Sequence, residues 1–112
     1  MTQPALAPGQ VWFTDFEPVR GREQGKDRPA LIVSSEFHLA LTAGQLVIVL
    51  PLTTVERPGW LHRVATGSGG WVITEQVRTV SATRLRCFAP EIALTADELA
   101  DVRRVLAHML TV

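Results

Sequence analysis

The apolar run at residues 46–52, with the sequence Leu-Val-Ile-Val-Leu-Pro-Leu, constrains the fold more than any other segment of this chain. Seven residues are too few to span a bilayer as a helix, and a short continuous apolar run is typical of a buried strand. A second run of this kind occupies residues 29–33, directly before two serines. Both segments are therefore predicted to be strands in the interior of the fold.

Turn-forming residues divide much of the remaining chain into further short strands. Residues 11–16 are rich in β-branched and aromatic side chains and are followed by Glu-Pro. Residues 62–66 and 71–74 flank a glycine-rich turn, which is the pattern of a β-hairpin. Residues 76–81 alternate polar with apolar side chains, so we expect one more strand with Val77 and Val80 facing inward. This strand would close the sheet into a barrel.

The C-terminal part of the chain carries a helix signal. Thr95 and Glu98 have the spacing of a capping box, in which each residue satisfies a backbone amide of the first helical turn. Apolar residues follow at helical spacing, namely Leu99, Val102, Leu106, Met109 and Leu110. Several short strands and one terminal helix indicate a mainly β fold, a small and strongly bent antiparallel barrel.

A chain of 112 residues, 46% of them apolar, is long enough for one domain with a hydrophobic core and too short for two. We expect a single domain over residues 1–112, with residues 1–8 as a loose N-terminal arm. Cys87, for which burial is expected, is the only cysteine, and no Cys/His spacing fits a metal site. The first residues lack a signal-peptide pattern, so a cytoplasmic location without membrane association is expected.

The formal charge excludes only a globally basic protein, because eleven Lys and Arg residues balance eleven Asp and Glu residues. The charges are segregated along the sequence. Residues 56–86 contain five arginines against two glutamates, whereas the stretch from Glu91 onward contains four acids against two arginines. A local cationic surface is therefore compatible with a neutral chain.

The polar segment at residues 20–28 has the highest density of charge, with four cations, two anions and two glycines. It either binds an anion such as phosphate, which arginine forks match, or is a solvated surface loop. Arg28 is its most informative member, because the apolar strand that follows would fix its position. Thr53 and Thr54 end the next apolar strand, where a hydroxyl either donates to a phosphate oxygen or caps its own backbone.

Six segments taken together point to a family. They are residues 9–12, 15–18, 21–24, 28–35, 49–53 and 75–80, and the most specific motif is G-x-E-Q-x-x-x-R-P-A-L. In order and spacing these segments resemble the MazF/PemK family, the toxins of toxin–antitoxin pairs. The resemblance runs from about residue 9 to the C-terminus. The chain departs from many relatives at residues 69–71, where Gly-Gly-Trp stands in place of a segment with Ser or a similar small polar residue.

The resemblance implies an SH3-like barrel with a C-terminal helix, the fold that the MazF/PemK family shares with CcdB. It also implies the toxin of a type II toxin–antitoxin system, acting as a sequence-specific, metal-independent endoribonuclease on single-stranded RNA. The ribose 2′-hydroxyl would attack the adjacent phosphate and leave a 2′,3′-cyclic phosphate and a 5′-hydroxyl. No cofactor is implied.

The resemblance also carries over residues, position by position. Arg28, Thr53 and Glu23 match catalytic positions: Arg28 would stabilise the phosphorane, Thr53 would hold a phosphate oxygen, and Glu23 would orient Arg28 or contact RNA. Gln76 would read a base, since an amide can donate and accept hydrogen bonds. The full set of RNA-binding residues expected is Arg22, Gln24, Thr54, Glu75, Gln76 and Arg78.

The resemblance implies macromolecular partners as well. A homodimer is expected, held inactive by a cognate antitoxin whose acidic, disordered tail would cover the RNA groove. Operator DNA would be bound only through the antitoxin complex. Two alternatives remain open at this point: a gyrase-poisoning toxin of the CcdB type, and a non-catalytic SH3-like module that binds a partner.

Overall fold

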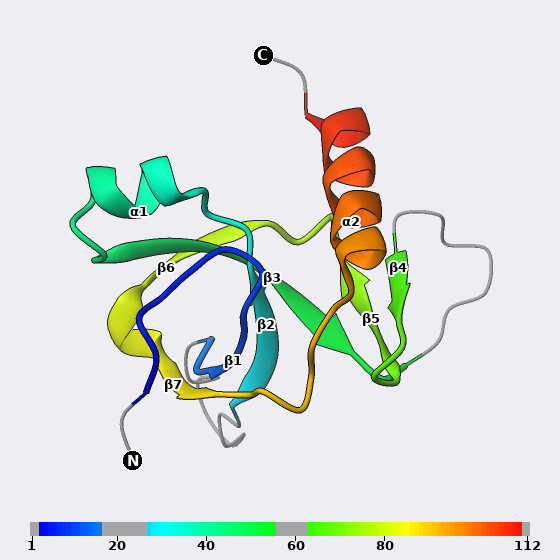
Figure 1. The fold of residues 1–112 in the computed structure, drawn as a ribbon, viewed down its shortest axis with the longest axis horizontal. Helices are drawn as coiled ribbons and strands as arrows, with labels where there is room; N and C mark the ends of the chain where they lie inside the picture. Colours follow the sequence, from blue (N-terminus) through cyan, green and yellow to red (C-terminus); the bar gives the residue numbers. More distant parts are fainter. Residues whose placement is uncertain (1–2, 17–26, 56–62, 111–112) are drawn as a thin grey trace, which may run out of the picture.

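The computed structural model describes residues 3–16, 27–55 and 63–110 of the chain. These ranges form a mainly β structure that ends in a helix (Figure 1). In chain order, the elements are β1 Val11–Thr14, β2 Arg28–Ile32, α1 Glu36–Leu41, β3 Leu46–Thr53, β4 Arg63–Thr66, β5 Gly70–Ile73, β6 Arg78–Ser81, a 3-10 helix Ala82–Arg84, β7 Leu85–Phe88 and α2 Ala96–Met109.

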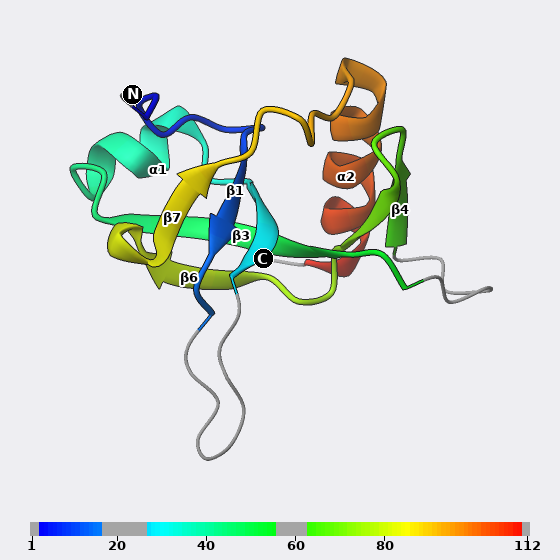
Figure 2. The same cartoon turned by 90° about the horizontal axis from the view of Figure 1, so that it is seen from below.

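The long strand β3 organises an antiparallel sheet. Its first four residues pair with β6, its last two pair with β5, and its middle pairs with β2 along the opposite edge. The full order of neighbours is β4-β5-β3-β2-β1-β7. Helices α1 and α2 lie toward opposite ends of β3, which crosses the molecule between them (Figures 1 and 2).

The prediction of a mainly β fold with a C-terminal helix is confirmed, but the prediction that the last strand closes a barrel is wrong. Among the described strands, no pairing joins β7 to β4 or to β6. Ser81 caps the short 3-10 helix after β6, and this turn redirects the chain. The next strand, β7, therefore pairs with β1 instead.

The strands bury side chains on both faces, as the continuous apolar runs predict. One core cluster consists of Val11, Leu31, Leu50, Leu52, Val64, Val72, Ala89 and Val102. The other consists of Trp12, Ala30, Ile32, Leu39, Val47, Val49, Val80 and Leu85. Neighbouring residues of β2 and β3 alternate between the two clusters, because successive strand side chains point to opposite faces. Helix α2 contributes Val102 to the first cluster and α1 contributes Leu39 to the second.

The predicted capping box of α2 is present. The Glu98 amide donates to Thr95 Oγ1 at 3.1 Å, and the Thr95 amide donates to Glu98 Oε1 at 2.9 Å. Val102 is buried and Leu106 packs against the first cluster. Met109 and Leu110 share the predicted apolar spacing but are exposed, because the last turn of the helix extends beyond the sheet (Figure 1).

Three elements, α1, the 3-10 helix and β7, have no counterpart among the predicted ones. Helix α1 begins at a capping serine, with the His38 amide donating to Ser35 Oγ at 3.0 Å. Strand β7 lies at the edge of the sheet, and its sequence Leu-Arg-Cys-Phe lacks the apolar run that marks an interior strand. Cys87 lies on β7 and is exposed, which corrects the expectation of a buried thiol.

Two further expectations differ from the structure. Strand β6 begins only at Arg78, and Val77 is 41% exposed, so the prediction that Val77 faces inward is wrong, whereas Val80 is buried as predicted. A turn in which the Gln76 amide donates to the Ile73 carbonyl shortens the strand. Within residues 1–8, for which a loose arm is expected, Gln3 makes one contact with the sheet: its Oε1 accepts from the Phe88 amide at 2.8 Å.

Candidate active site

Arg28 and Thr53 lie at the same end of the neighbouring strands β2 and β3. The β2–β3 pairing ends where Ala30 lies opposite Pro51. Beyond this point Arg28 pairs with Thr14 of β1, and Thr53 pairs with Trp71 of β5. Arg28 begins β2 and Thr53 ends β3, so both lie where the sheet opens toward solvent.

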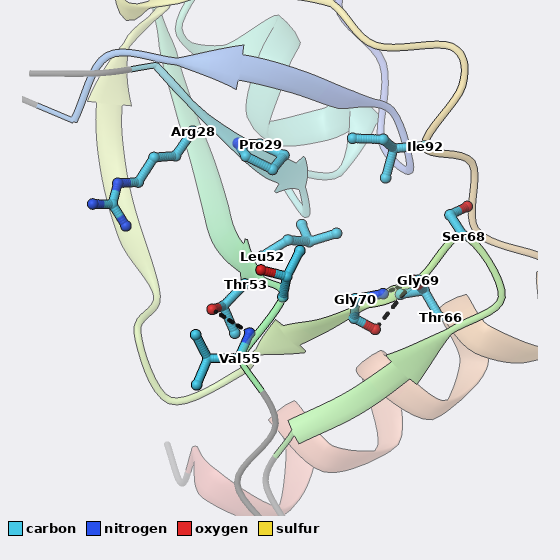
Figure 3. Close-up of a pocket in the computed structure, with 11 residues that line it drawn as sticks. Arg28, Pro29, Leu52, Thr53, Val55, Thr66, Ser68, Gly69, Gly70 and Ile92 are labelled. Atoms are coloured by element: carbon cyan, nitrogen blue, oxygen red, sulfur yellow. Dashed lines mark hydrogen bonds between the residues drawn. The ribbon is translucent and has the colours of Figure 1, made fainter.

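These two residues line a pocket with a volume of about 370 Å³. Arg28 and Thr53 lie toward one end of it, and Ile92 and Ser68 lie toward the other (Figure 3). The complete lining consists of Arg28, Pro29, Leu52, Thr53, Thr54, Val55, Thr66, Ser68, Gly69, Gly70 and Ile92. An apolar floor with a few polar groups and one guanidinium is typical of a site that takes a small organic anion or a nucleotide.

The guanidinium of Arg28 is available to a ligand. The residue is exposed, and in the part of the chain that the structure describes its side chain has no ion pair or side-chain hydrogen bond. Its backbone is held in β2 between β1 and β3, with Thr14 of β1 as a paired neighbour. A fixed backbone and five unused N–H donors favour binding of a phosphate in a bidentate geometry.

The hydroxyl of Thr53 accepts a hydrogen bond from the Val55 amide at 3.1 Å (Figure 3). This confirms the interpretation that a strand-end threonine caps its own backbone. The two uses of the hydroxyl are nevertheless compatible, because Oγ1 accepts from the amide and its own proton remains to be donated. The cap orients the hydroxyl at the pocket while leaving it a donor for an anionic oxygen.

Gly70 contributes to the site in a way that the sequence pattern did not reveal. A Cβ atom at Gly70 would lie 3.1 Å from the carbonyl oxygen of Thr53, so the close approach of β5 to the end of β3 depends on glycine here. Trp71, the next residue, pairs with Thr53. The glycine pair before Trp71 was the available signal, since glycine in a strand often marks a close backbone approach.

The other predicted site residues are only partly brought together. Thr54 lines the pocket. Glu75 and Gln76 are exposed in the turn between β5 and β6. Arg78 lines a separate pocket of about 250 Å³, and its guanidinium lies 4.9 Å from the centre of the Phe16 ring. Three predicted residues, Arg22, Glu23 and Gln24, lie outside the described residues.

The described residues present neither a metal-ligating cluster nor a helix that could span a membrane. Across residues 3–16, 27–55 and 63–110, no group of three or more His, Cys, Asp or Glu side chains is placed to hold a metal ion. In the same ranges, no helix has both the length and the apolar character needed to cross a bilayer. The pocket presents a guanidinium, hydroxyls and backbone groups around an apolar floor.

Comparison with known proteins gives consistent similarities. Residues 7–110 match the family described as "PemK-like, MazF-like toxin of type II toxin-antitoxin system". The chain is 32% identical over 109 residues to the endoribonuclease MazF9 of Mycobacterium tuberculosis, with 88% of this chain and 90% of that protein covered. It is 29% identical over 99 residues to the endoribonuclease EndoA of Bacillus subtilis, with 83% of each covered.

Solved structures share the fold. A MazF crystal structure from Deinococcus radiodurans superimposes with a TM-score of 0.70 at 28% identity, covering 96% of this chain and 97% of that chain. A MazE–MazF crystal structure from the same organism gives a TM-score of 0.76 at 24% identity, covering 95% of this chain and 96% of that chain. The similarity thus extends over nearly the whole length of both chains.

Proposed function

Because the chain belongs to the PemK-like, MazF-like toxins of type II toxin–antitoxin systems, we propose that it is a cytoplasmic, sequence-specific endoribonuclease that cleaves single-stranded RNA without a metal ion. Two relatives that cover most of the chain are named endoribonucleases, which supports this class of reaction. The observation that carries the proposal is that Arg28 and Thr53 both line one end of an open pocket (Figure 3).

The proposed reaction is transfer of the scissile phosphate to the neighbouring ribose. The 2′-hydroxyl loses its proton as its oxygen forms a bond to phosphorus, the bond from phosphorus to the 5′-oxygen breaks, and the leaving oxygen takes up a proton, so no net proton is gained or lost. The products are a 2′,3′-cyclic phosphate and a 5′-hydroxyl. Negative charge develops on the phosphorane oxygens, and donors fixed around them lower the barrier.

Arg28 and Thr53 have complementary roles in this step. The Arg28 guanidinium stabilises the two developing negative oxygens through its planar fork. The Thr53 hydroxyl, oriented by the Val55 amide, donates to one of them. A guanidinium keeps its charge in proteins, so Arg28 serves as an electrostatic donor and not as the base for the 2′-hydroxyl. Glu23 of the neighbouring segment orients Arg28 or contacts RNA.

RNA on either side of the cut is contacted by polar residues around the site. Thr54 lines the pocket, and Glu75 and Gln76 expose their side chains from the β5–β6 turn. An amide and a carboxylate can pair with the edges of unstacked bases. The remaining members of the proposed RNA-binding set are Arg22, Gln24 and Arg78.

We also propose that the toxin is a homodimer and that a cognate antitoxin with an acidic, disordered segment inhibits it. An endoribonuclease from a Mycobacterial species, similar in fold at a TM-score of 0.73 and 24% identity with 93% of each chain covered, has been solved in complex with its cognate antitoxin. The acidic segment would bind the cationic segments at residues 20–28 and 56–86. Operator DNA is contacted only through the antitoxin.

Cleavage of a long single-stranded RNA in EDTA tests the proposed activity. The cut ends are mapped, and the Arg28→Ala and Thr53→Ala variants are compared with wild type. Arg104→Ala is the matched control, because Arg104 is exposed on α2 and pairs with Asp101 at 3.3 Å. Thr53→Ser tests the hydroxyl directly, since serine retains the donor.

The outcomes separate the alternatives. The assignment of Arg28 and Thr53 as catalytic residues is supported if wild type, Arg104→Ala and Thr53→Ser cleave the RNA while Arg28→Ala and Thr53→Ala lose most of the activity. Undiminished cleavage by Arg28→Ala and Thr53→Ala contradicts it. Absence of any RNA cleavage by wild type, together with inhibition of gyrase, favours a toxin of the CcdB type.

A further inference from the structure

The hairpin turn between β4 and β5 forms one wall of the pocket, and it is hydrogen-bonded to α2 and to the segment that precedes α2. Thr66, Ser68, Gly69 and Gly70 line the pocket from this turn. The Gly67 amide donates to Glu98 Oε2 at 2.7 Å. The Ser68 hydroxyl donates to the Ala93 carbonyl at 3.2 Å. Two hydrogen bonds from distant parts of the chain therefore fix the turn against the segment that leads into α2.

The Glu98 carboxylate links the turn to the helix. Its Oε1 atom accepts from the Thr95 amide at 2.9 Å, which completes the capping box. Its Oε2 atom accepts from Gly67, in a short charge-assisted hydrogen bond. Each oxygen thus has its own backbone donor, and the helix cap and the pocket wall share one side chain.

The apolar part of the pocket, which extends from Arg28 and Thr53 toward Ile92, has the character of a surface for a flat ring (Figure 3). Pro29, Leu52 and Ile92 supply apolar contacts, and Gly69 and Gly70 complete the lining. In single-stranded RNA, unstacked bases bind between such apolar surfaces, and polar groups at the edge distinguish one base from another. A scissile phosphate held by Arg28 and Thr53 would place a base of the same nucleotide, or of the next, beside this surface.

We propose that this part of the pocket holds a nucleobase adjacent to the scissile phosphate, and that Glu98 is a positioning residue that fixes the wall selecting that base. The proposal rests on the ribonuclease function proposed above. Glu98 acts through the Gly67 amide and touches neither the RNA nor the reacting atoms. If the turn shifts by a fraction of an ångström, the fit of the preferred base is lost before the chemistry at Arg28 and Thr53 is affected.

The competing explanation for the contacts of Glu98 is a purely structural role in capping α2. The Glu98→Gln variant distinguishes this role from positioning of the pocket wall. A glutamine at the third helical position still completes a capping box, because its amide oxygen accepts from the Thr95 amide. Its NH₂ group cannot accept from the Gly67 amide. Glu98→Gln therefore retains the helix cap and removes the contact with the turn. Thr95→Ala does the reverse, since it removes the cap hydroxyl and leaves Glu98 beside Gly67.

The experiment maps the cut sites of each variant on a pool of random-sequence single-stranded RNA. Wild type should discriminate among bases at one position next to the cut. Glu98→Gln and Ser68→Ala, which remove the two anchors separately, should each weaken that discrimination by roughly three- to ten-fold, the factor for one lost hydrogen bond. Ile92→Ala should weaken it as well, because it removes an apolar contact with the base.

The controls and the readouts distinguish positioning from stability. Asp97→Asn removes a charge from the same helical turn and should leave the base preference unchanged. Thr95→Ala should lower the melting temperature and also leave the preference unchanged. For an oligonucleotide with the preferred base, Glu98→Gln should raise KM more than it lowers kcat.

Unchanged base preference in both Glu98→Gln and Ser68→Ala would overturn the inference while leaving the proposed function intact. Absence of cleavage by wild type would instead overturn the proposed function, and the inference with it.

Discussion

Replacing Gly70 with alanine should impair cleavage more than it impairs folding. The new Cβ would lie 3.1 Å from the Thr53 carbonyl oxygen, so the backbone of Thr53 must move by a few tenths of an ångström. A misplacement of 1 Å can cost about a hundred-fold in rate, so a shift of this size should lower kcat/KM by roughly three- to ten-fold. Overpacking should offset the usual gain of a Gly→Ala change and leave a net destabilisation of about 1 kcal/mol.

The assay combines initial cleavage rates of a defined oligonucleotide with urea denaturation of each variant. Gly67→Ala is the matched control, because its Cβ would lie 3.5 Å from Glu98 Oε2, an ordinary contact, and the Gly67 amide is kept. Its kcat/KM should remain within about two-fold of wild type, as for most surface substitutions. If Gly70→Ala cleaves as fast as Gly67→Ala, the close approach of β5 does not position Thr53 and the reasoning fails.

Three other substitutions test separate parts of the argument. Arg28→Ala should lower kcat by roughly a hundred- to a thousand-fold in single-turnover cleavage. Arg28→Lys keeps the charge but loses the planar fork, so its kcat should fall by less. Binding of a non-cleavable RNA analogue should depend on salt, and Arg28→Ala should reduce the slope of log Kd against log salt by about 0.7, the value for one phosphate contact. Val102→Ala should destabilise the fold by about 1–3 kcal/mol in urea denaturation without changing cut sites, because Val102 is buried in the first core cluster and does not line the pocket.

The parts of the fold that follow from local patterns could be predicted from the sequence. The continuous apolar runs become β2 and β3, and the Thr95–Glu98 pair becomes the cap of α2. In each case the signal and the structure depend on residues close together in the chain. The open sheet was not predictable in this way, because pairing of β7 with β1 is a long-range choice and β7 has no apolar pattern of its own. Val77 shows the same limit, since a turn at Gln76 overrides the local alternation.

In the candidate site, too, the residues that could be predicted are those with a local signal in the sequence. Arg28 and Thr53 were identified because each adjoins an apolar strand and matches a family position, and the fold then places both in the lining of one pocket. Glu98 was identified only as a helix cap, since nothing in its local sequence indicates the contact with Gly67 across 31 residues. Gly70 also needed the structure, because its role depends on the Thr53 carbonyl of another strand. Both residues act through contacts with distant parts of the chain, so the local sequence pattern does not predict their roles.

Charge counted along the sequence also differs from charge presented to a ligand. Residues 56–86 form a cationic segment, yet Arg84 and Arg86 both contact the Asp15 carboxylate, at 3.4 and 3.0 Å. Asp15 follows β1 and these arginines belong to the 3-10 helix and β7, so the ion pairs join neighbouring elements of the sheet. Two of the segment's five arginines are therefore committed to the fold. Arg28 makes no comparable contact within the described residues, so its positive charge is the one that this neutral chain would offer to the phosphate in the proposed function.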